Sequence, residues 1–333
     1  MAGVLGIDIG GANIKTAHNG TAKTHPFEVW KNPEGLASEL ARVLQGVPAF
    51  DHLAVTMTAE LCDCYATKRE GVAAILRAVR TAAPDARIST WSTAGQFVDA
   101  ETALKEHLAV ASANWHALAT FVGRFPEGTA LLIDVGSTTT DIIPIAAGKP
   151  TPKGLKDYDR RQTSELLYTG VRRTPVCALL GPLVLAEVFA TSLDAFLITG
   201  EIPEEPGNKL TADGRPATRE AAHARLARML GADGETCSKD ETQKLAAKVV
   251  AKQEEIMYSA IRRVASTLPG LPTTVILSGS GEFLGARVAK KALASAQVIS
   301  LSEKLGPEVS KAACAHAVSV LAQELSSGSG FQS

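Results

Sequence analysis

Apolar and polar positions along the chain predict two similar series of strands and helices. Each series opens with a short apolar segment that ends near Asp and Gly. A second segment rich in β-branched residues follows, which is typical of two strands joined by a tight turn. These pairs are GVLGIDI with NIKTAH in the first half and ALLIDVG with TTTDIIPIA in the second. Strands and helices then alternate, so we expect an α/β protein with mixed sheets flanked by helices.

The remaining elements are predicted from the period of their apolar residues, which is about two in strands and about 3.6 in helices. In the first half we expect strands at 25–30, 50–58 and 86–93 and helices at 32–47, 66–83 and 107–123. In the second half we expect helices near 182–191, 218–230, 240–266, 282–294 and 307–325, with strands at 273–281 and 296–301. Two helix starts carry their own signals, namely Asn32 with Pro33, and Thr67.

The two series align residue by residue, which predicts an internal duplication. The matched pairs are Asp8 with Asp134, Gly10 with Gly136, and Lys15 with Asp141. We therefore expect a first lobe over residues 1–126 and a second over 127–325, with a cleft between them. The polar tail at 326–333 is expected to be disordered.

Composition limits the class of protein. A chain of 333 residues exceeds a usual single core, which also favours two lobes. With 34 basic and 35 acidic residues, it is not expected to bind nucleic acid or a membrane surface. Neither a membrane span nor a signal peptide is expected, and the five cysteines suit a reducing cytoplasm. Cys62 and Cys64 are interpreted as small semi-buried residues in preference to zinc ligands, because a zinc site needs four ligands.

The two glycine turns have the residues of an anion cradle. Glycine lets backbone N–H groups approach an anion without obstruction, and hydroxyl side chains add donors. Asp8 and Asp134, just before the turns, are expected to hold Mg²⁺ that bridges phosphate oxygens. The alternative, that Gly and Asp serve turn geometry alone, is less favoured because the pattern occurs twice. The expected phosphate-binding residues are Gly10, Gly11, Asn13, Lys15, Gly136, Ser137, Thr138 and Thr139.

A third glycine turn, LSGSGEFLG, lies late in the chain between a predicted strand and helix. Its spacing is G-x-G-x-x-x-G, which differs from the dinucleotide fingerprint of Rossmann folds. The chain has no G-x-x-x-x-G-K-[ST], which excludes the P-loop class.

These three turns, in this order, resemble the actin/sugar-kinase/Hsp70 superfamily. The resemblance spans nearly the whole chain and implies duplicated ribonuclease-H-like domains with an interdomain cleft. It also implies two phosphate motifs and a late glycine turn at an adenosine pocket. Gly279, Gly281 and Glu282 would form that pocket if a nucleotide is used. Whether ATP binds is left open.

Three longer segments of the sequence indicate a particular family within this superfamily. VTMTAELCDCYATKREGV, ELLYTGVRRTPVCAL and TADGRPATREAAHARLARMLGAD are similar to hydantoinase/oxoprolinase-related proteins of tetrahydromethanopterin-linked one-carbon metabolism. That family includes a synthase of methanofuran biosynthesis. The resemblance implies condensation of an aminomethylfuran-methyl diphosphate with the phenol of γ-glutamyltyramine or of a tyrosine-type acceptor. The products are an aryl ether and diphosphate.

Further candidate residues follow the fourth strand of the first lobe, where cleft residues are expected. Glu60 and Lys68 are the candidates for catalysis alongside Asp8 and Asp134, and Asp63 and Arg69 are candidates for substrate contacts. An equally favoured interpretation of residues 68–70 is a solvated first helical turn. Cations there oppose the helix dipole, which slightly favours a bound anion.

The second lobe offers a second set of substrate contacts. Arg172 and Arg173, beside Tyr168, suit binding of phosphate or of the acceptor's carboxylate. A strand with one surface ion pair is an equally good interpretation. Residues 200–220 lack a core pattern, so we expect a lid or substrate loop with Asp213 and Arg215 as contacts.

Two other functions compete with the synthase. One is an ATP-dependent kinase or hydrolase of the same fold, and the other is a nucleotide-sensing or assembly protein. The absence of a peptide-binding domain or long insertion disfavours the assembly protein. The oligomeric state is not determined by the sequence, and a homodimer is one option.

Overall fold

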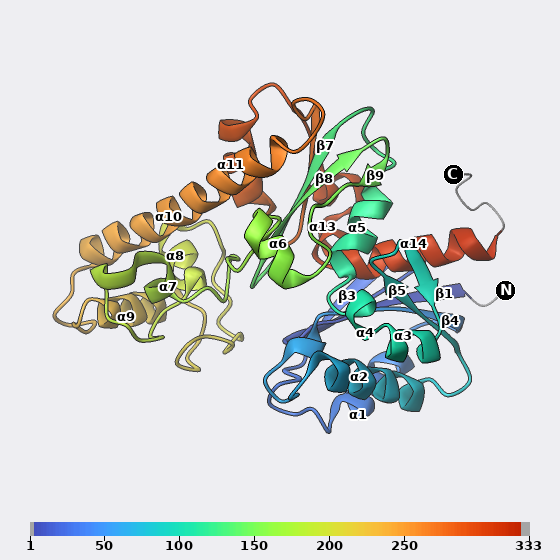
Figure 1. Cartoon of the computed structure of the whole chain (residues 1–333). Coiled ribbons are helices and arrows are strands. Elements are labelled where there is room, and N and C mark those ends of the chain that lie inside the picture. Colours follow the sequence, from blue (N-terminus) through green and yellow to red (C-terminus); the bar gives the residue numbers. More distant parts are fainter. Residues whose placement is uncertain (1–2, 328–333) are drawn as a thin grey trace.

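The computed structural model describes residues 3–327 and contains two mixed β-sheets (Figure 1). The first sheet has the strand order β3-β2-β1-β4-β5-β6. Its strands, in chain order, are β1 (Gly3–Ile9), β2 (Asn13–His18), β3 (Thr21–Pro26), β4 (Phe50–Met57), β5 (Arg87–Ser92) and β6 (Gln96–Val98).

The second sheet repeats this order as β10-β8-β7-β11-β12. Its strands are β7 (Ala130–Val135), β8 (Thr140–Ala146), β9 (Lys149–Pro150), which pairs with β8, β10 (Leu166–Leu167), β11 (Thr274–Ser278) and β12 (Gln297–Ser300). In both sheets three antiparallel strands are followed by two parallel ones. This shared topology confirms the predicted duplication of a ribonuclease-H-like unit.

The register of the two opening hairpins also matches. Asp8 lies opposite Lys15 on β1 and β2, and Asp134 lies opposite Asp141 on β7 and β8. The alignment of the two halves therefore has a direct structural counterpart. A difference in charge, a lysine facing one aspartate and a second aspartate facing the other, lies beside the turns.

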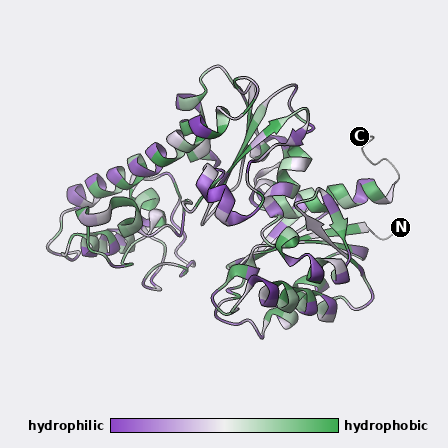
Figure 2. Ribbon diagram, viewed as in Figure 1, coloured by the Kyte–Doolittle hydropathy of each residue, from purple (hydrophilic) through white to green (hydrophobic). Residues whose placement is uncertain are grey.

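Helices connect the strands and pack against both sheets. The first lobe contains α1 (Leu36–Gln45), η1 (Ala59–Leu61), α2 (Lys68–Ala82), α3 (Ala100–Lys105), α4 (His107–Val110) and α5 (Asn114–Val122). The rest of the chain contains α6 (Asp157–Thr163), α7 (Val176–Leu180), η2 (Gly181–Leu183), α8 (Ser192–Thr199), α9 (Arg219–Met229), α10 (Lys239–Ala265), α11 (Glu282–Ala292), α12 (Leu301–Leu305), α13 (Pro307–Lys311) and α14 (Ala313–Ser326). In Figure 2 the strands are largely apolar, while α10 alternates apolar and polar faces.

Two helices, α5 and α14, form a layer shared by both sheets. Their apolar residues pack with Val4 and Ala54 of the first sheet and with Leu132 and Ile276 of the second. The contact with β1 is close at Gly6, where an added Cβ would lie 2.0 Å from the carbonyl oxygen of Ala315 on α14. The C-terminal helix thus contacts the first lobe, which a simple division at residue 126 does not anticipate.

Several element boundaries differ from the sequence-based expectation. The third strand is Thr21–Pro26, and α1 begins at Leu36 after Gly35. No helix spans 182–191, because Gly181 takes φ +54° and Pro182 ends α7, so that α8 begins only at Ser192.

The long helix expected at 107–123 is divided at Ser112, which has φ +49°, and the closing helix is divided at Ala312. The helix over residues 68–82, capped by Thr67, is confirmed. Most of the expected tail lies outside the described residues.

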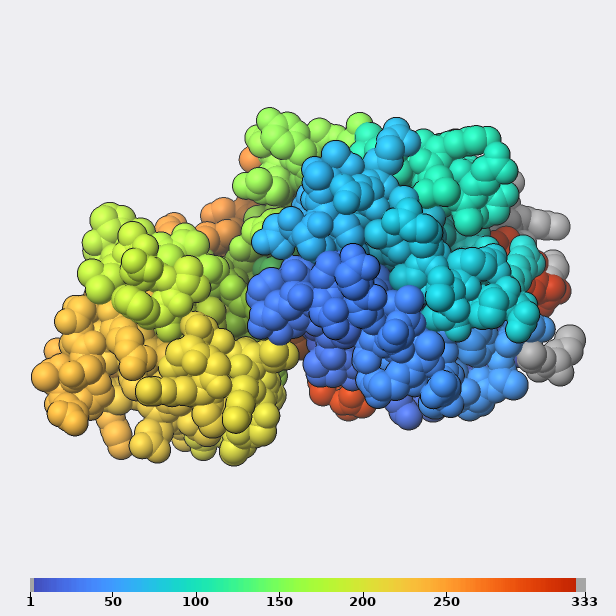
Figure 3. Space-filling model, turned by 90° about the horizontal axis from the view of Figure 1, so that it is seen from below, coloured from blue at the N-terminus to red at the C-terminus, as the bar shows by residue number. Residues whose placement is uncertain are grey.

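A helical extension, α7 to α10, projects from the second sheet (Figure 1). Figure 3 shows its outer part, in yellow and orange, beside the first lobe in blue. Within residues 3–327 no helix is long and apolar enough to cross a membrane.

The close contact at Gly6 gives a stability prediction. Gly6→Ala should lower the free energy of unfolding by about 3 kcal/mol, the upper end of overpacking costs, because its methyl group must displace the α14 backbone. Urea denaturation measures the effect. Gly270→Ala is the matched control, since a Cβ there meets nothing within 4 Å, and it should change stability by less than about 0.5 kcal/mol. Equal effects of both substitutions would contradict the importance of this contact.

Candidate active site

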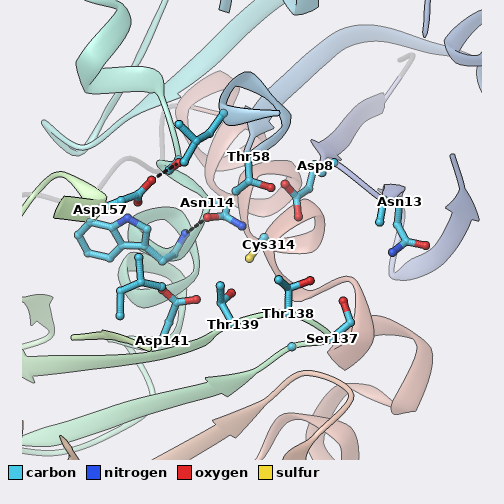
Figure 4. A pocket seen from close by; sticks show the side chains of 18 of the residues that line it. Asp8, Asn13, Thr58, Asn114, Ser137, Thr138, Thr139, Asp141, Asp157 and Cys314 are labelled. Atoms are coloured by element: carbon cyan, nitrogen blue, oxygen red, sulfur yellow. Dashed lines mark hydrogen bonds between the residues drawn. The ribbon is translucent and has the colours of Figure 1, made fainter. Parts of the chain in front are cut away.

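A cavity of about 520 Å³ lies where the two opening hairpins meet. Figure 4 shows Asp8 and Asn13 on one side and Ser137, Thr138 and Thr139 on the other. The lining residues of the first lobe and α14 are Asp8, Gly10, Gly11, Ala12, Asn13, Lys15, Trp30, Thr58, Leu61, Cys62, Asp63, Ser112, Asn114, Trp115 and Cys314. Those of the second lobe are Asp134, Gly136, Ser137, Thr138, Thr139, Asp141, Asp157, Arg160, Leu166, Tyr168 and Arg173.

The two turns are closed by the same hydrogen bond. The N–H of Gly10 donates to the carbonyl of Asn13 at 2.9 Å, and the N–H of Gly136 donates to the carbonyl of Thr139 at 2.9 Å. These two amides are used inside their turns. In this structure the amides of Gly10 and Gly136 are therefore not free to donate to an anion, although both glycines line the cavity.

The carbonyl groups of the turns are bound by a loop behind each hairpin. The carbonyl of Gly11 accepts from the N–H of Val29 at 2.9 Å, and that of Ser137 accepts from the amides of Arg172 and Arg173 at 3.0 and 2.9 Å. Fixing the carbonyls from behind leaves N–H groups that have no hydrogen bond within the described chain, and such groups form an anion-binding concavity. These amides belong to Gly11, Ala12, Ser137, Thr138 and Thr139.

Two cations of the cavity are available for an anionic ligand. Lys15 and Arg173 have no carboxylate within 4 Å among residues 3–327. Burial alone would lower the pKa of Lys15, but Asp8 and other neighbours raise it. The net shift is upward, so the Lys15 amine is protonated. Arg160 differs, because it binds Asp141 at 2.6 Å and stacks 3.9 Å above the ring of Trp115.

Asp8 and Asp134 lie at the floor of the cavity. Burial raises the pKa of both carboxyl groups, and Asp141 adds to the effect at Asp134, whose pKa reaches about 7. Oδ1 of Asp8 is buried without a hydrogen-bond partner. Two carboxylates, one of which has an oxygen without a partner, suit Mg²⁺, which commonly takes one or two protein carboxylates together with phosphate oxygens and water. Within the described part of the chain no group of three His, Cys, Asp or Glu could hold a metal alone.

Glu60 belongs to a hydrogen-bonded group beside the cavity. Its Oε1 accepts from the hydroxyl of Ser112 at 2.7 Å, and the same hydroxyl oxygen lies 2.9 Å from Oδ2 of Asp157. Lys68 lies 3.0 Å from that Asp157 oxygen and 3.9 Å from Glu60. Burial raises the pKa of Glu60 to about 7, against the opposing effects of Ser112 and Lys68.

This group can share a proton. A hydroxyl carries one hydrogen, so Ser112 can donate to only one of its two carboxylate neighbours and must accept from the other when that one is protonated. Ser112 also takes the sparsely populated left-handed conformation, with φ +49°, which non-glycine residues hold where the surrounding structure imposes it. Glu60, Ser112 and Lys68 belong to the first lobe, and Asp157 to the second.

Some predicted substrate contacts do not reach the cavity. Arg69 is on the outer side of α2 and donates to the carbonyl of Leu104. Arg172 forms an ion pair with Glu205, and Asp213 pairs with the buried Arg225 at 3.0 Å. Arg215 is exposed. These side chains serve structural pairs or face solvent, so their predicted contacts with substrate are not supported. Asp63, Tyr168 and Arg173 do line the cavity.

The late glycine turn is packed against the second hairpin. A Cβ on Gly279 or on Gly281 would meet atoms of Val135 at 2.4 and 2.5 Å, and the N–H of Gly281 donates to the carbonyl of Val135 at 2.8 Å. The carboxylate of Glu282 accepts from the hydroxyls of Ser300 and Ser310. None of the three residues lines the cavity. Gly279 and Gly281 allow close packing against Val135, a role that the G-x-G-x-x-x-G spacing of the sequence did not indicate.

Sequence reasoning missed part of the site. Ser112, Asn114 and Trp115 come from the break between α4 and α5, which was expected to be one helix. Asp157 and Arg160 lie on α6, where the run KDYDRR was a charged signal that could have been used. Other missed lining residues are Trp30, Thr58, Leu61 and Cys314.

Known proteins resemble the chain over most of its length. The hydantoinase/oxoprolinase family matches residues 51–165. A protein of Methanocaldococcus jannaschii, the "(4-{4-[2-(gamma-L-glutamylamino)ethyl]phenoxymethyl}furan-2-yl)methanamine synthase", is 36% identical, with 96% of this chain and 98% of that protein covered. A synthase of the same name from Methanococcus vannielii is 31% identical over 61% of this chain and 95% of that protein.

A solved structure supports the fold. The nucleotide-free structure of acetone carboxylase superposes with a TM-score of 0.55 at 10% identity, over 95% of this chain and 70% of that one. The chain thus shares the fold of that protein, and its repeated sheet topology is the one expected of duplicated ribonuclease-H-like domains. Because the relative of 36% identity is covered almost entirely, the chain belongs to the family of the (4-{4-[2-(gamma-L-glutamylamino)ethyl]phenoxymethyl}furan-2-yl)methanamine synthases.

Proposed function

We propose that this protein condenses an aminomethylfuran-methyl diphosphate with a phenol, forming the aryl ether of a methanofuran-type cofactor and releasing diphosphate. The observation that carries the proposal is the pair of turns that line one cavity and have amides with no hydrogen bond within the described chain. A diphosphate offers two adjacent phosphate groups, one for each turn. The product named for the relatives, a phenoxymethyl-furan methanamine, contains the ether bond that this reaction makes.

In the reaction the phenol oxygen bonds to the furan methylene carbon, and the bond from that carbon to diphosphate oxygen breaks. The phenol loses its proton, and the diphosphate leaves with the electron pair. Amides of Gly11, Ser137 and Thr138 face the leaving oxygens, where negative charge develops and fixed donors help most. Lys15 and Arg173 supply balancing positive charge.

The phenol proton passes to the group around Glu60. Asp157 lines the cavity and can take the proton first, and Ser112 can pass a proton on to Glu60. The furan ring stabilises positive charge at its methylene, so this base assistance need only be modest. Lys68 balances the two carboxylates.

Mg²⁺ is the proposed metal, and Asp8 and Asp134 are the residues that would hold it, directly or through water. When bound, it would neutralise charge on the diphosphate as a Lewis acid. The partnerless Oδ1 of Asp8 supports this assignment. ATP is not required for the proposed chemistry, since the diphosphate is already the activated group.

A direct assay tests the proposal. The purified protein is incubated with the furan diphosphate, γ-glutamyltyramine and Mg²⁺, and the aryl ether is sought by mass spectrometry. We expect one diphosphate released for each ether formed. Hydrolysis of ATP in the absence of any furan, with no ether formed, would instead support a kinase-like or hydrolase function.

Lys15 provides a test of anion binding. Lys15→Met should lower kcat/KM for the furan diphosphate by about 10- to 100-fold, the range for losing one charge-assisted hydrogen bond. Steady-state kinetics measure the change. Lys23→Met is the control, because Lys23 is exposed on β3 and has no ion pair in the described chain, and it should leave the rate unchanged. A full rate for Lys15→Met would refute the role of this cation.

The pKa of Glu60, about 7, predicts a pH dependence. Glu60 acts as an anion that accepts a proton, so kcat/KM should rise with pH and level off above about 7. Glu60→Gln should reduce kcat by about 100-fold, near the lower end for acid–base catalysis, and should reduce the slope of log(kcat/KM) against pH below 7 by one proton. An unchanged slope would exclude Glu60 as the proton acceptor.

A further inference from the structure

A second cavity, of about 590 Å³, adjoins the first. The two share Leu61, Asp157 and Tyr168. The second cavity is lined from both lobes, by residues near α2 and α4 on one side and by the start of α6 on the other. A ligand in this space would thus reach the first cavity, where the furan diphosphate is proposed to bind.

The walls of the second cavity are apolar and unusually exposed. Leu61 is 50% exposed, Leu108 42%, Tyr158 71% and Tyr168 55%. Four large apolar side chains that gather around one open cavity, rather than packing in a core, indicate a surface that binds an apolar or aromatic group. Aromatic rings prefer such neighbours in edge or offset contact.

The charges of the second cavity are mainly positive. Lys68, Lys156 and Arg161 face a single carboxylate, Asp157, among its described lining residues. Lys68 is paired with Asp157 at 3.0 Å. Lys156 and Arg161 have no carboxylate within 4 Å in residues 3–327, and the guanidinium of Arg161 lies 6.0 Å from the ring centre of Tyr168. Two unpaired cations beside aromatic walls suit a ligand that is both aromatic and carboxylated.

We infer that the second cavity binds the phenolic acceptor, a phenol whose tail carries a carboxylate. The ring lies among Leu108, Tyr158 and Tyr168, and the tail carboxylate lies at Lys156 and Arg161. The phenol oxygen points to Asp157, at the junction of the two cavities. This assignment rests on the proposed function and names the site of its second substrate.

The placement differs from the one that the sequence indicated for the acceptor carboxylate. Arg172 is already paired with Glu205, and Arg173 faces the turns of the first cavity. The acceptor cavity is lined by residues of both lobes. It is therefore complete only when the lobes are in contact, with Asp157 of the second lobe bound to Ser112 and Lys68 of the first. The phenol is thus held beside the group that takes its proton.

Two phenols that differ in whether the tail has a carboxylate test the assignment. γ-Glutamyltyramine carries an α-carboxylate together with an α-ammonium group, and N-acetyltyramine has the same phenol with a tail that carries neither. In the double variant Lys156→Ala/Arg161→Ala, the KM for γ-glutamyltyramine should rise roughly tenfold, as expected for loss of two partly exposed ion pairs. The KM for N-acetyltyramine and for the furan diphosphate should change less than about twofold, within the small effects of surface changes.

Lys248→Ala is the matched control, because Lys248 is exposed on α10 far from both cavities. The single variants should each give part of the effect, which guards against misfolding of the double variant. Equal changes for both phenols, or a change confined to the furan diphosphate, would overturn the assignment while ether formation continued. If the wild-type protein formed no ether from either phenol, the proposed function itself would fail, and the assignment with it.

Discussion

The contact of α14 with β1 is the constraint on which the rest of the structure depends. The missing side chain of Gly6 lets the backbone of α14 lie directly on the first sheet, and Ser319 donates a hydrogen bond to the carbonyl of Val4 at 3.0 Å. The same helix buries apolar residues of the second sheet. One helix therefore holds both sheets, and only in that arrangement do the two hairpins open on a common cavity.

With the two sheets held together, the chemistry of the turns depends on which of their backbone N–H and C=O groups are already hydrogen-bonded within the protein. A loop behind each hairpin fixes the carbonyl groups of Gly11 and Ser137, and amides of the lining turn residues have no hydrogen bond within the described chain. The duplication extends to these hydrogen bonds, because each turn is closed by the same bond, from Gly10 to Asn13 in one and from Gly136 to Thr139 in the other. The charges do not repeat, since Lys15 faces Asp8 while Asp141 faces Asp134. The backbone of the two turns is therefore alike, whereas the charged side chains beside them differ.

The carboxylates at the lobe boundary connect the two cavities. Asp157 comes from the second lobe and meets Ser112 and Lys68 of the first, with Glu60 behind them. The short separations allow these groups to share a proton, and burial raises the pKa of Glu60 to about 7. The same residues border the space assigned to the acceptor. Asp157 and its neighbours therefore serve the contact between the lobes and, in the proposed reaction, both acceptor binding and proton transfer.

Sequence by itself determined the duplicated α/β topology, because the apolar period and glycine turns of both hairpins are local signals. It also placed Asp8, Asp134, Lys15 and the turn residues at the site. Only the tertiary structure decided the rest. The break at Ser112, the arrival of Asp157 from α6 and the pairing of Arg172 with Glu205 arise from contacts between distant segments, which no local pattern contains. The free amides likewise depend on the loops behind the turns, since a sequence does not show which backbone groups its later residues will bind.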